Sequence, residues 1–207
     1  IFWMYADCWG EVGWTVIDYY LSRKPSYWAV RRAFSPTLVS LVDDGDEVGV
    51  WLVNDRLHDV DGELTVGWLN LMTGELQLDE RSATAPGNAA ERDWEMARPN
   101  GPEGRWMELA RFESGGEVLS RNRLFLTGFR FNELELPDAH VTCEPTGDAR
   151  SLRLESDAFA WHVHIDAPRA VRLSDNDFDM LPGDVRHVAV QGPRDQLEKV
   201  SARPISP

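Results

Sequence analysis

Short apolar runs alternate with polar turns along most of the chain, which is the pattern of an all-β protein. Runs of this kind begin after residue 37 and recur at close spacing. We therefore predict a first β-sandwich, with strands over 38–42, 48–53, 63–71, 75–79, 105–113 and 117–126. The tract over 82–105 is rich in Ala, Pro, Gly and Asn, so we expect a long loop there.

A second, smaller set of strands follows a connector over 129–137. Its predicted strands cover 139–143, 151–155, 158–166, 170–173 and 185–190. Turn residues separate them, and no helix of useful length is expected after Phe34. The pattern therefore predicts a second sandwich.

The first 36 residues have a different texture. Residues 1–5 are apolar and aromatic and predict a fully buried strand, whereas 24–34 predict a helix that Pro25 begins and Pro36 ends. One strand and one helix have no core of their own, and the aromatic start has neither initiator Met nor signal-peptide features. We expect the chain to begin within a longer protein, and predict domains over 1–36, 37–132 and 133–207.

Composition narrows the possible partners. The formal net charge of −14 argues against nucleic acid and against anionic membrane surfaces, and no stretch is long enough to span a membrane. With only Cys8 and Cys143 present, neither a disulfide framework nor a cysteine metal site is expected. Nine tryptophans are many for 207 residues, and tryptophan serves both cores and sugar-stacking platforms.

Two side chains of the opening run could have a function. Asp7 ends the predicted strand and Trp3 lies on it, a position that carries function if the strand belongs to a (β/α) barrel. Packing and capping would explain both residues equally well. No cofactor fingerprint is present, so no cofactor is expected.

Metal sites are not predicted. His162 and His164 alternate on one strand face, but a solvated face explains them better because no second ligand pair of matching type is nearby. The run from Asp175 to Asp179 resembles a calcium loop, yet Met180 and Arg186 stand where that loop needs Gly and Glu. We expect a turn held by its own Asx side chains.

No catalytic residue is predicted within the chain. Glycosidases usually need two carboxylates that flank the scissile bond, and periodicity places no such pair here. The acids from Asp43 to Glu47 read as a solvated hairpin end, and no catalytic triad order or phosphate loop is present.

Three stretches of sequence resemble one family. They are the opening run from Phe2 to Trp9 with the helix that ends Phe34-Ser35-Pro36, the strand from Leu119 to Leu126, and the turn from Arg172 to Phe178. Together they resemble the end of β-mannosidases, retaining enzymes of glycoside hydrolase family 2. The resemblance implies a mainly β fold, in which two immunoglobulin-like β-sandwiches follow a βα remnant of a (β/α)8 barrel.

The resemblance also implies a function. The parent enzyme is expected to remove non-reducing terminal β-mannosides from β-linked oligosaccharides, with both catalytic glutamates on barrel strands upstream of Ile1. Trp3 is expected to floor the pocket of the non-reducing sugar, and Asp7 to lie near it. Ala6 replaces the usual Asn, which leaves β-glucosaminides and β-galactosides open as substrates. The location stays unknown from the sequence, with the cytoplasm favoured, and a signal peptide would not be visible because the N-terminus of the parent enzyme is expected to be missing.

Two alternatives remain open from the sequence. The chain could be a freestanding sandwich tandem that binds carbohydrate or protein, which requires exposed aromatic side chains on a sandwich face. It could also be a structural module whose aromatic opening packs on a partner chain. The tryptophans available for a sandwich platform are Trp51, Trp68, Trp94, Trp106 and Trp161.

Overall fold

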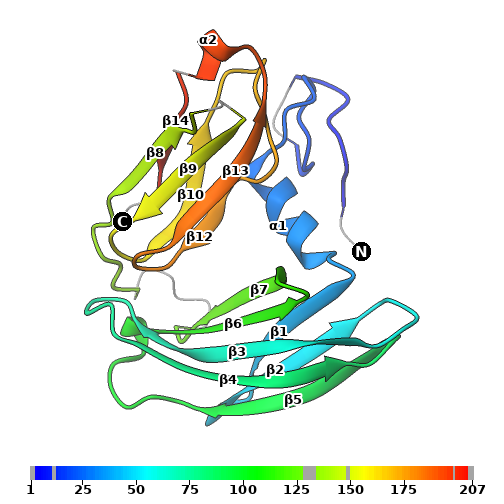
Figure 1. Cartoon of the computed structure of the whole chain (residues 1–207), viewed down its shortest axis with the longest axis vertical. Coiled ribbons are helices and arrows are strands. Elements are labelled where there is room, and N and C mark those ends of the chain that lie inside the picture. The colour runs from blue at the N-terminus through cyan, green and yellow to red at the C-terminus, as the bar shows by residue number, and fades with distance from the viewer. Residues whose placement is uncertain (1–2, 11–12, 128–133, 148–149, 198, 205–207) are drawn as a thin grey trace. The chain divides into compact units, whose positions relative to one another are not determined.

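Strands dominate the structure, a computed structural model that describes residues 3–10, 13–127, 134–147, 150–197 and 199–204 (Figure 1). The chain divides into two units, one formed by Arg32–Leu136 and the other by Ile1–Arg31 together with Pro137–Pro207. The predicted mainly β fold with two sandwiches is confirmed. The domain boundaries drawn from the sequence remain a prediction.

The first unit is a sandwich of two antiparallel sheets (Figure 1). A short 3₁₀ turn, Glu103–Arg105, precedes its sixth strand. One sheet has the order β1-β2-β5, from Thr37–Asp43, Glu47–Asn54 and Ala89–Ala97. The other has the order β4-β3-β6-β7, from Leu76–Ala85, Val60–Asn70, Trp106–Ser114 and Glu117–Phe125.

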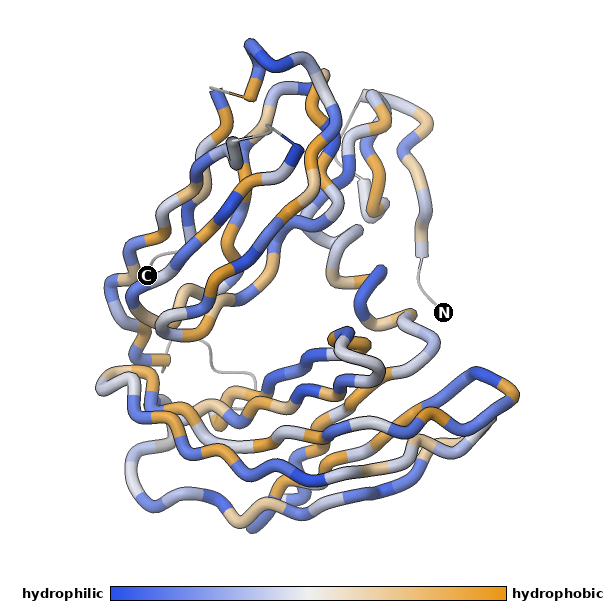
Figure 2. The backbone as a smooth tube through the Cα atoms, in the orientation of Figure 1, coloured by the Kyte–Doolittle hydropathy of each residue, from blue (hydrophilic) through white to orange (hydrophobic). Residues whose placement is uncertain are grey.

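Alternation builds the core of this sandwich. Along the strands, hydrophobic and hydrophilic positions alternate (Figure 2), so one side chain in two points between the sheets. On β3, Leu64, Val66 and Trp68 are buried core residues. On β6, Trp106, Ala110 and Phe112 repeat the pattern, which explains why these two strands pair over eight residues.

The loop predicted over 82–105 is wrong. Strand β4 continues to Ala85, and β5 occupies Ala89–Ala97. The signal that would have revealed β5 is the placement of Trp94 and Met96 beside acidic neighbours, because both pack against the core. A β-bulge at Asp93, which has no partner on β2, interrupts the alternation of apolar and polar residues. The strand was therefore not recognised from the sequence.

Two polar side chains of β7 connect the sheets along one edge. The Val39 amide donates to Ser120 Oγ at 3.0 Å, and Asn122 Nδ2 donates to the Val39 carbonyl at 3.0 Å. Both backbone groups belong to β1, the edge strand of the opposite sheet. These residues lie in the stretch that resembles the family, and the structure gives them a structural role there.

Removing one of these bonds is expected to destabilise the first sandwich. Ser120→Ala leaves the amide of buried Val39 without its acceptor, which costs about 1–3 kcal/mol. Denaturant unfolding measures the change, with Glu117→Ala as the control because Glu117 is exposed on the same strand. Equal stability of the two variants would contradict the role given to Ser120.

The second sandwich lies in the other unit and is smaller (Figure 1). Its sheets have the orders β11-β13-β9-β8 and β12-β10-β14. A short helix, α2 (Arg194–Leu197), precedes the last strand. The strands are β8 (Val141–Pro145), β9 (Ser151–Ser156), β10 (Ala160–Asp166), β11 (Arg172–Leu173), β12 (Phe178–Met180), β13 (Val185–Gln191) and β14 (Ser201–Arg203).

The helix predicted ahead of the sandwiches is confirmed as α1 (Pro25–Ala33), with Trp28 as its buried residue. The buried strand predicted over 1–5 is wrong for residues 3–5, and residues 1–2 lie outside the described range. A single parallel bridge, between Ala6 and Ile17, is assigned there. Because no long strand of the described chain pairs with this run, its aromatic side chains stay in solvent.

Candidate functional site

Residues 3–10 and 13–24, which we name the aromatic segment, are held together by backbone hydrogen bonds. The Val16 amide donates to the Met4 carbonyl at 3.2 Å, and the Ile17 amide donates to the Tyr5 carbonyl at 3.0 Å. The Asp7 amide in turn donates to the Ile17 carbonyl at 3.0 Å. These bonds place the run that carries Trp3 and Asp7 beside residues 14–17.

The aromatic segment presents an unusual amount of exposed aromatic surface. Trp3 is 80% exposed and Trp14 is 88% exposed, although tryptophan is usually well buried. Exposed apolar side chains mark binding surfaces where they form a contiguous patch. The exposed aromatic side chains of the segment are those of Trp3, Tyr5, Trp9, Trp14, Tyr19 and Tyr20.

Asp7 has a different environment from Trp3. Its carboxylate Oδ2 accepts a 2.7 Å hydrogen bond from Lys24 Nζ, which also donates to Thr15 Oγ1 at 2.7 Å and to the Gly13 carbonyl at 3.2 Å. Hydrogen bonds from Lys24 and then from Thr15 hold the pKa of Asp7 below its ordinary value. Asp7 therefore anchors the loop that carries Trp3, and its role toward a sugar stays a prediction.

The five sandwich tryptophans are all buried or only partly exposed. Trp68 and Trp106 are buried in the first sandwich. Trp51, Trp94 and Trp161 are only partly exposed, and the Arg81 guanidinium covers the ring of Trp94 at 4.2 Å. Within the described residues, the exposed tryptophans all belong to the aromatic segment. A freestanding tandem that binds carbohydrate or protein stays an open alternative, although none of its five candidate tryptophans is fully exposed.

The two histidines of β10 converge on one buried carboxylate. Asp177 has a side chain only 1% exposed, and its Oδ1 lies 2.7 Å from His164 Nδ1 and 3.1 Å from His162 Nε2. The solvated face expected for these histidines is thus only half correct, because both rings also pair with the turn from 174 to 179. Within the described range, no group of three His, Cys, Asp or Glu side chains could hold a metal ion.

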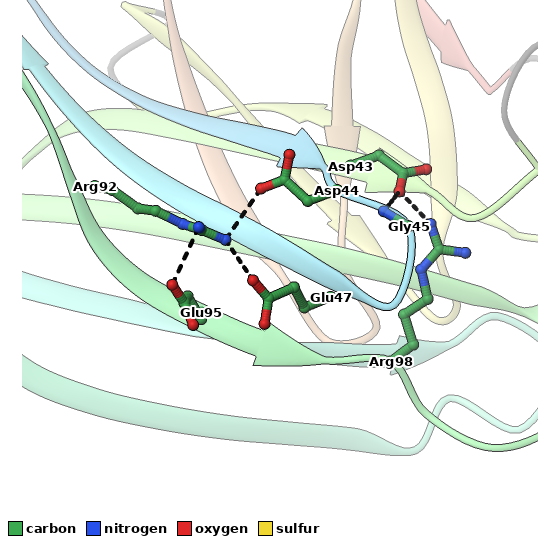
Figure 3. Close-up of polar contacts among 7 residues, drawn as sticks. All are labelled: Asp43, Asp44, Gly45, Glu47, Arg92, Glu95 and Arg98. Carbon is green, nitrogen blue, oxygen red and sulfur yellow. Dashed lines mark hydrogen bonds and ion pairs between the residues drawn. The ribbon is translucent and has the colours of Figure 1, made fainter.

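The acidic hairpin end of the first sandwich is more ordered than its sequence suggested. The Arg92 guanidinium pairs with Asp44 at 3.0 Å, Glu47 at 2.8 Å and Glu95 at 3.1 Å (Figure 3). Burial opposes ionisation of Asp43, but hydrogen bonds from the Gly45 amide and from Arg98 outweigh it and lower the pKa of Asp43. These carboxylates therefore form ion pairs and hydrogen bonds within the first sandwich.

One buried acid was missed from the sequence. Glu108 is fully buried on the core face of β6, directly opposite Trp68 in the register of β3. Neither of its carboxylate oxygens has a hydrogen-bond partner among the described residues, and burial raises its pKa to about 8. The signal lay in the alternation of Trp106, Glu108 and Ala110 on one face.

Two further findings concern the cysteines and the lengths of the helices. Cys8 and Cys143 are both free thiols in the structure. The described part of the chain contains no helix long and apolar enough to cross a membrane.

Comparison with known families matches both sandwiches. Residues 46–130 match the mannosidase Ig/CBM-like domain, and residues 134–203 match the Ig-fold domain of mannosidases. The chain therefore carries one domain that matches each of these two mannosidase domain families. The predicted resemblance to the C-terminal portion of β-mannosidase-like enzymes is thereby confirmed.

Relatives extend the similarity beyond the sandwiches. The chain is 22% identical over 210 residues to β-mannosidase B of Emericella nidulans, which covers 93% of the chain and 25% of the relative. It shares the fold of the β-D-mannosidase of Dictyoglomus thermophilum, with a TM-score of 0.86, 24% identity and coverage of 99% of this chain and 26% of that one. The exo-chitosanase of Amycolatopsis orientalis has a TM-score of 0.69 at 14% identity, over 98% and 30% of the two chains.

The lengths differ strongly. The chain spans about a quarter of the curated relatives that it matches. It thus corresponds to an accessory region with immunoglobulin-like domains of a β-mannosidase-type enzyme.

Proposed function

We propose that the chain is the accessory region of a retaining exo-β-glycosidase that acts on non-reducing terminal β-mannosides, and that the catalytic glutamates lie outside it. In such an enzyme one Glu attacks the sugar and a second Glu serves as acid and base. The observation that carries the proposal is the order of two mannosidase-type domains behind an aromatic segment with exposed tryptophans.

Trp3 is the residue of this chain proposed to contact the sugar. A sugar ring presents an apolar face of C–H groups, and an exposed indole offers a flat surface of matching size. Asp7 and Lys24 hold the backbone behind Trp3 through their 2.7 Å contact. The remaining exposed aromatics are proposed to pack on the catalytic domain of the parent enzyme.

The carboxylates of the sandwiches do not suggest a catalytic pair. Asp61 and Glu63 of β3 line a groove together with Ser82 and Thr84 of β4. Asp61 accepts a 2.7 Å hydrogen bond from Thr84, and Glu63 accepts one of 3.1 Å from Ser82. Ligand pockets are lined mainly by hydrophobic and aromatic side chains, and none of the residues that line this groove is aromatic.

A chimera tests the proposal. The matched quarter of the Dictyoglomus thermophilum β-D-mannosidase is replaced by this chain, and hydrolysis of para-nitrophenyl β-mannoside is measured. We expect activity from the chimera and at least a tenfold loss of kcat/KM, about 1.4 kcal/mol, on Trp3→Ala. Leu57→Ala is the control, because Leu57 is an exposed apolar side chain between β2 and β3 of the first sandwich.

Two results would contradict the proposal. One is a folded chimera without activity, which would show that this chain cannot serve as the accessory region. The other is a Trp3→Ala chimera with the kinetic constants of the Leu57→Ala chimera, which would mean that Trp3 does not contact the sugar.

A further inference from the structure

Two arginines connect the start of the chain to one turn of the second sandwich. Arg23 Nη1 donates to the Leu173 carbonyl at 3.1 Å, and Arg31 Nη1 donates to the Ser174 carbonyl at 2.5 Å. More than 140 residues separate donor and acceptor in each bond. Residues 1–31 and 137–207 accordingly form one unit.

The same two arginines are fixed by one buried ring. Trp28 is 3% exposed, and the guanidinium carbons of Arg23 and Arg31 lie 5.1 Å and 5.6 Å from its ring centroid. Arg23 also lies 5.0 Å from the ring of Tyr27. Cation–π contacts of this kind order the long arginine side chains before they reach the turn, which lowers the entropic cost of the two hydrogen bonds.

The accepting turn is rigid as well. Ser174 exchanges two hydrogen bonds of 2.9 Å with Ala189, one through its amide and one through its hydroxyl. Asn176 bonds both backbone groups of Ile165. The carbonyls of Leu173 and Ser174 are therefore held in place when the arginines reach them.

A third contact involves Tyr20, which precedes Arg23 in the aromatic segment. The guanidinium of Arg169 lies 4.5 Å from the ring centroid of Tyr20. Arg169 precedes β11, the strand that leads into the accepting turn. The second sandwich thus contacts the aromatic segment at Tyr20 and Arg23, and it contacts α1 at Arg31.

We propose that Arg23 and Arg31 form a clamp by which the second sandwich positions the aromatic segment. Each arginine joins a backbone carbonyl of the turn to the buried Trp28 ring, so that the turn, α1 and the residues before it move together. The second sandwich then has a specific task, to hold the surface that carries Trp3. The clamp acts within this chain, so its test does not depend on the proposed glycosidase activity.

Hydrogen exchange on the 207-residue chain tests the clamp. In the Arg23→Ala/Arg31→Ala double variant, the amides of Met4, Val16 and Ile17 are expected to exchange at least about tenfold faster, because two charge-assisted bonds are lost. The amides of Ile165 and Ala189 within the second sandwich are expected to keep their rates. The emission of the exposed tryptophans is expected to change in parallel.

Three further variants complete the experiment. Arg31→Lys keeps the charge and one donor and is expected to restore part of the protection, and each single alanine variant is expected to give an intermediate rate. Arg153→Ala is the matched control, since Arg153 belongs to the same unit but pairs with Glu155 at 2.7 Å. Unchanged rates in residues 4–17 of the double variant, or equal acceleration in the Arg153→Ala control, would overturn the clamp.

Discussion

Glu108→Gln is expected to remove most of the pH dependence of the first sandwich between pH 5 and 8. In the folded state burial raises the pKa of Glu108 to about 8, whereas its ordinary value is 4.5. Between these values the folded state keeps the proton and the unfolded state releases it. The free energy of unfolding therefore falls by about 1.4 kcal/mol for each pH unit across this window.

Because the pKa of Glu108 is raised in the folded state, the free energy of unfolding falls with pH only between the two pKa values. Below pH 4.5 the carboxyl is protonated in both states, and above about 8 it is ionised in both, so the contribution is level outside the window. By pH 8 the accumulated loss amounts to roughly 4 kcal/mol, which the neutral amide of Glu108→Gln does not suffer.

Denaturant unfolding from pH 5 to 9 measures the profile. Glu117→Gln is the control, because Glu117 is exposed on the neighbouring strand β7 and its amide variant should follow the wild-type curve. A wild-type profile that is level from pH 5 to 8, or one that Glu108→Gln leaves unchanged, would show that the carboxyl is not buried as the structure places it.

Asn176→Ala is expected to destabilise the second sandwich by about 3 kcal/mol, because it removes three hydrogen bonds at a buried site. The Asn176 Oδ1 atom accepts from the amides of Ile165 at 2.7 Å and of Asp177 at 2.8 Å, and its Nδ2 donates to the Ile165 carbonyl at 3.0 Å. The side chain thereby occupies the place of a strand backbone beyond β12. Alanine leaves both backbone groups of Ile165 without these partners.

Thermal unfolding followed through the second sandwich checks this prediction. Asp166→Ala is the control, since Asp166 is exposed at the end of the same strand as Ile165. A loss of less than about 1 kcal/mol in Asn176→Ala, similar to the control, would mean that the turn is not held through Asn176.

The sequence predicted the sandwich strands well where alternation was regular. Leu64, Val66 and Trp68 alternate without interruption, so β3 could be placed. Strand β5 could not, because the bulge at Asp93 shifts its alternation by one residue and small residues dominate its start. The apolar residues at the start of the chain misled the prediction of a buried strand, because the side chains of Trp3 and Tyr5 lie in solvent and not in a core.

Of the candidate site, too, only a part could be predicted from the sequence. Trp3 could be chosen because an aromatic residue in this run resembles a family position, and the structure leaves its ring accessible. The partner of Asp7 could not be predicted, because Lys24 is distant in sequence and only the fold of the loop brings the two together. Arg23 and Arg31 escaped notice for the same reason, since backbone carbonyls leave no sequence signal.

The most direct test of the central claim is hydrolysis of para-nitrophenyl β-mannoside by the purified 207-residue chain. An accessory region without the catalytic glutamates is expected to release para-nitrophenol no faster than buffer does, at any protein concentration. Release that rises in proportion to the concentration of the chain would contradict the claim, because the catalytic pair would then have to lie within these residues.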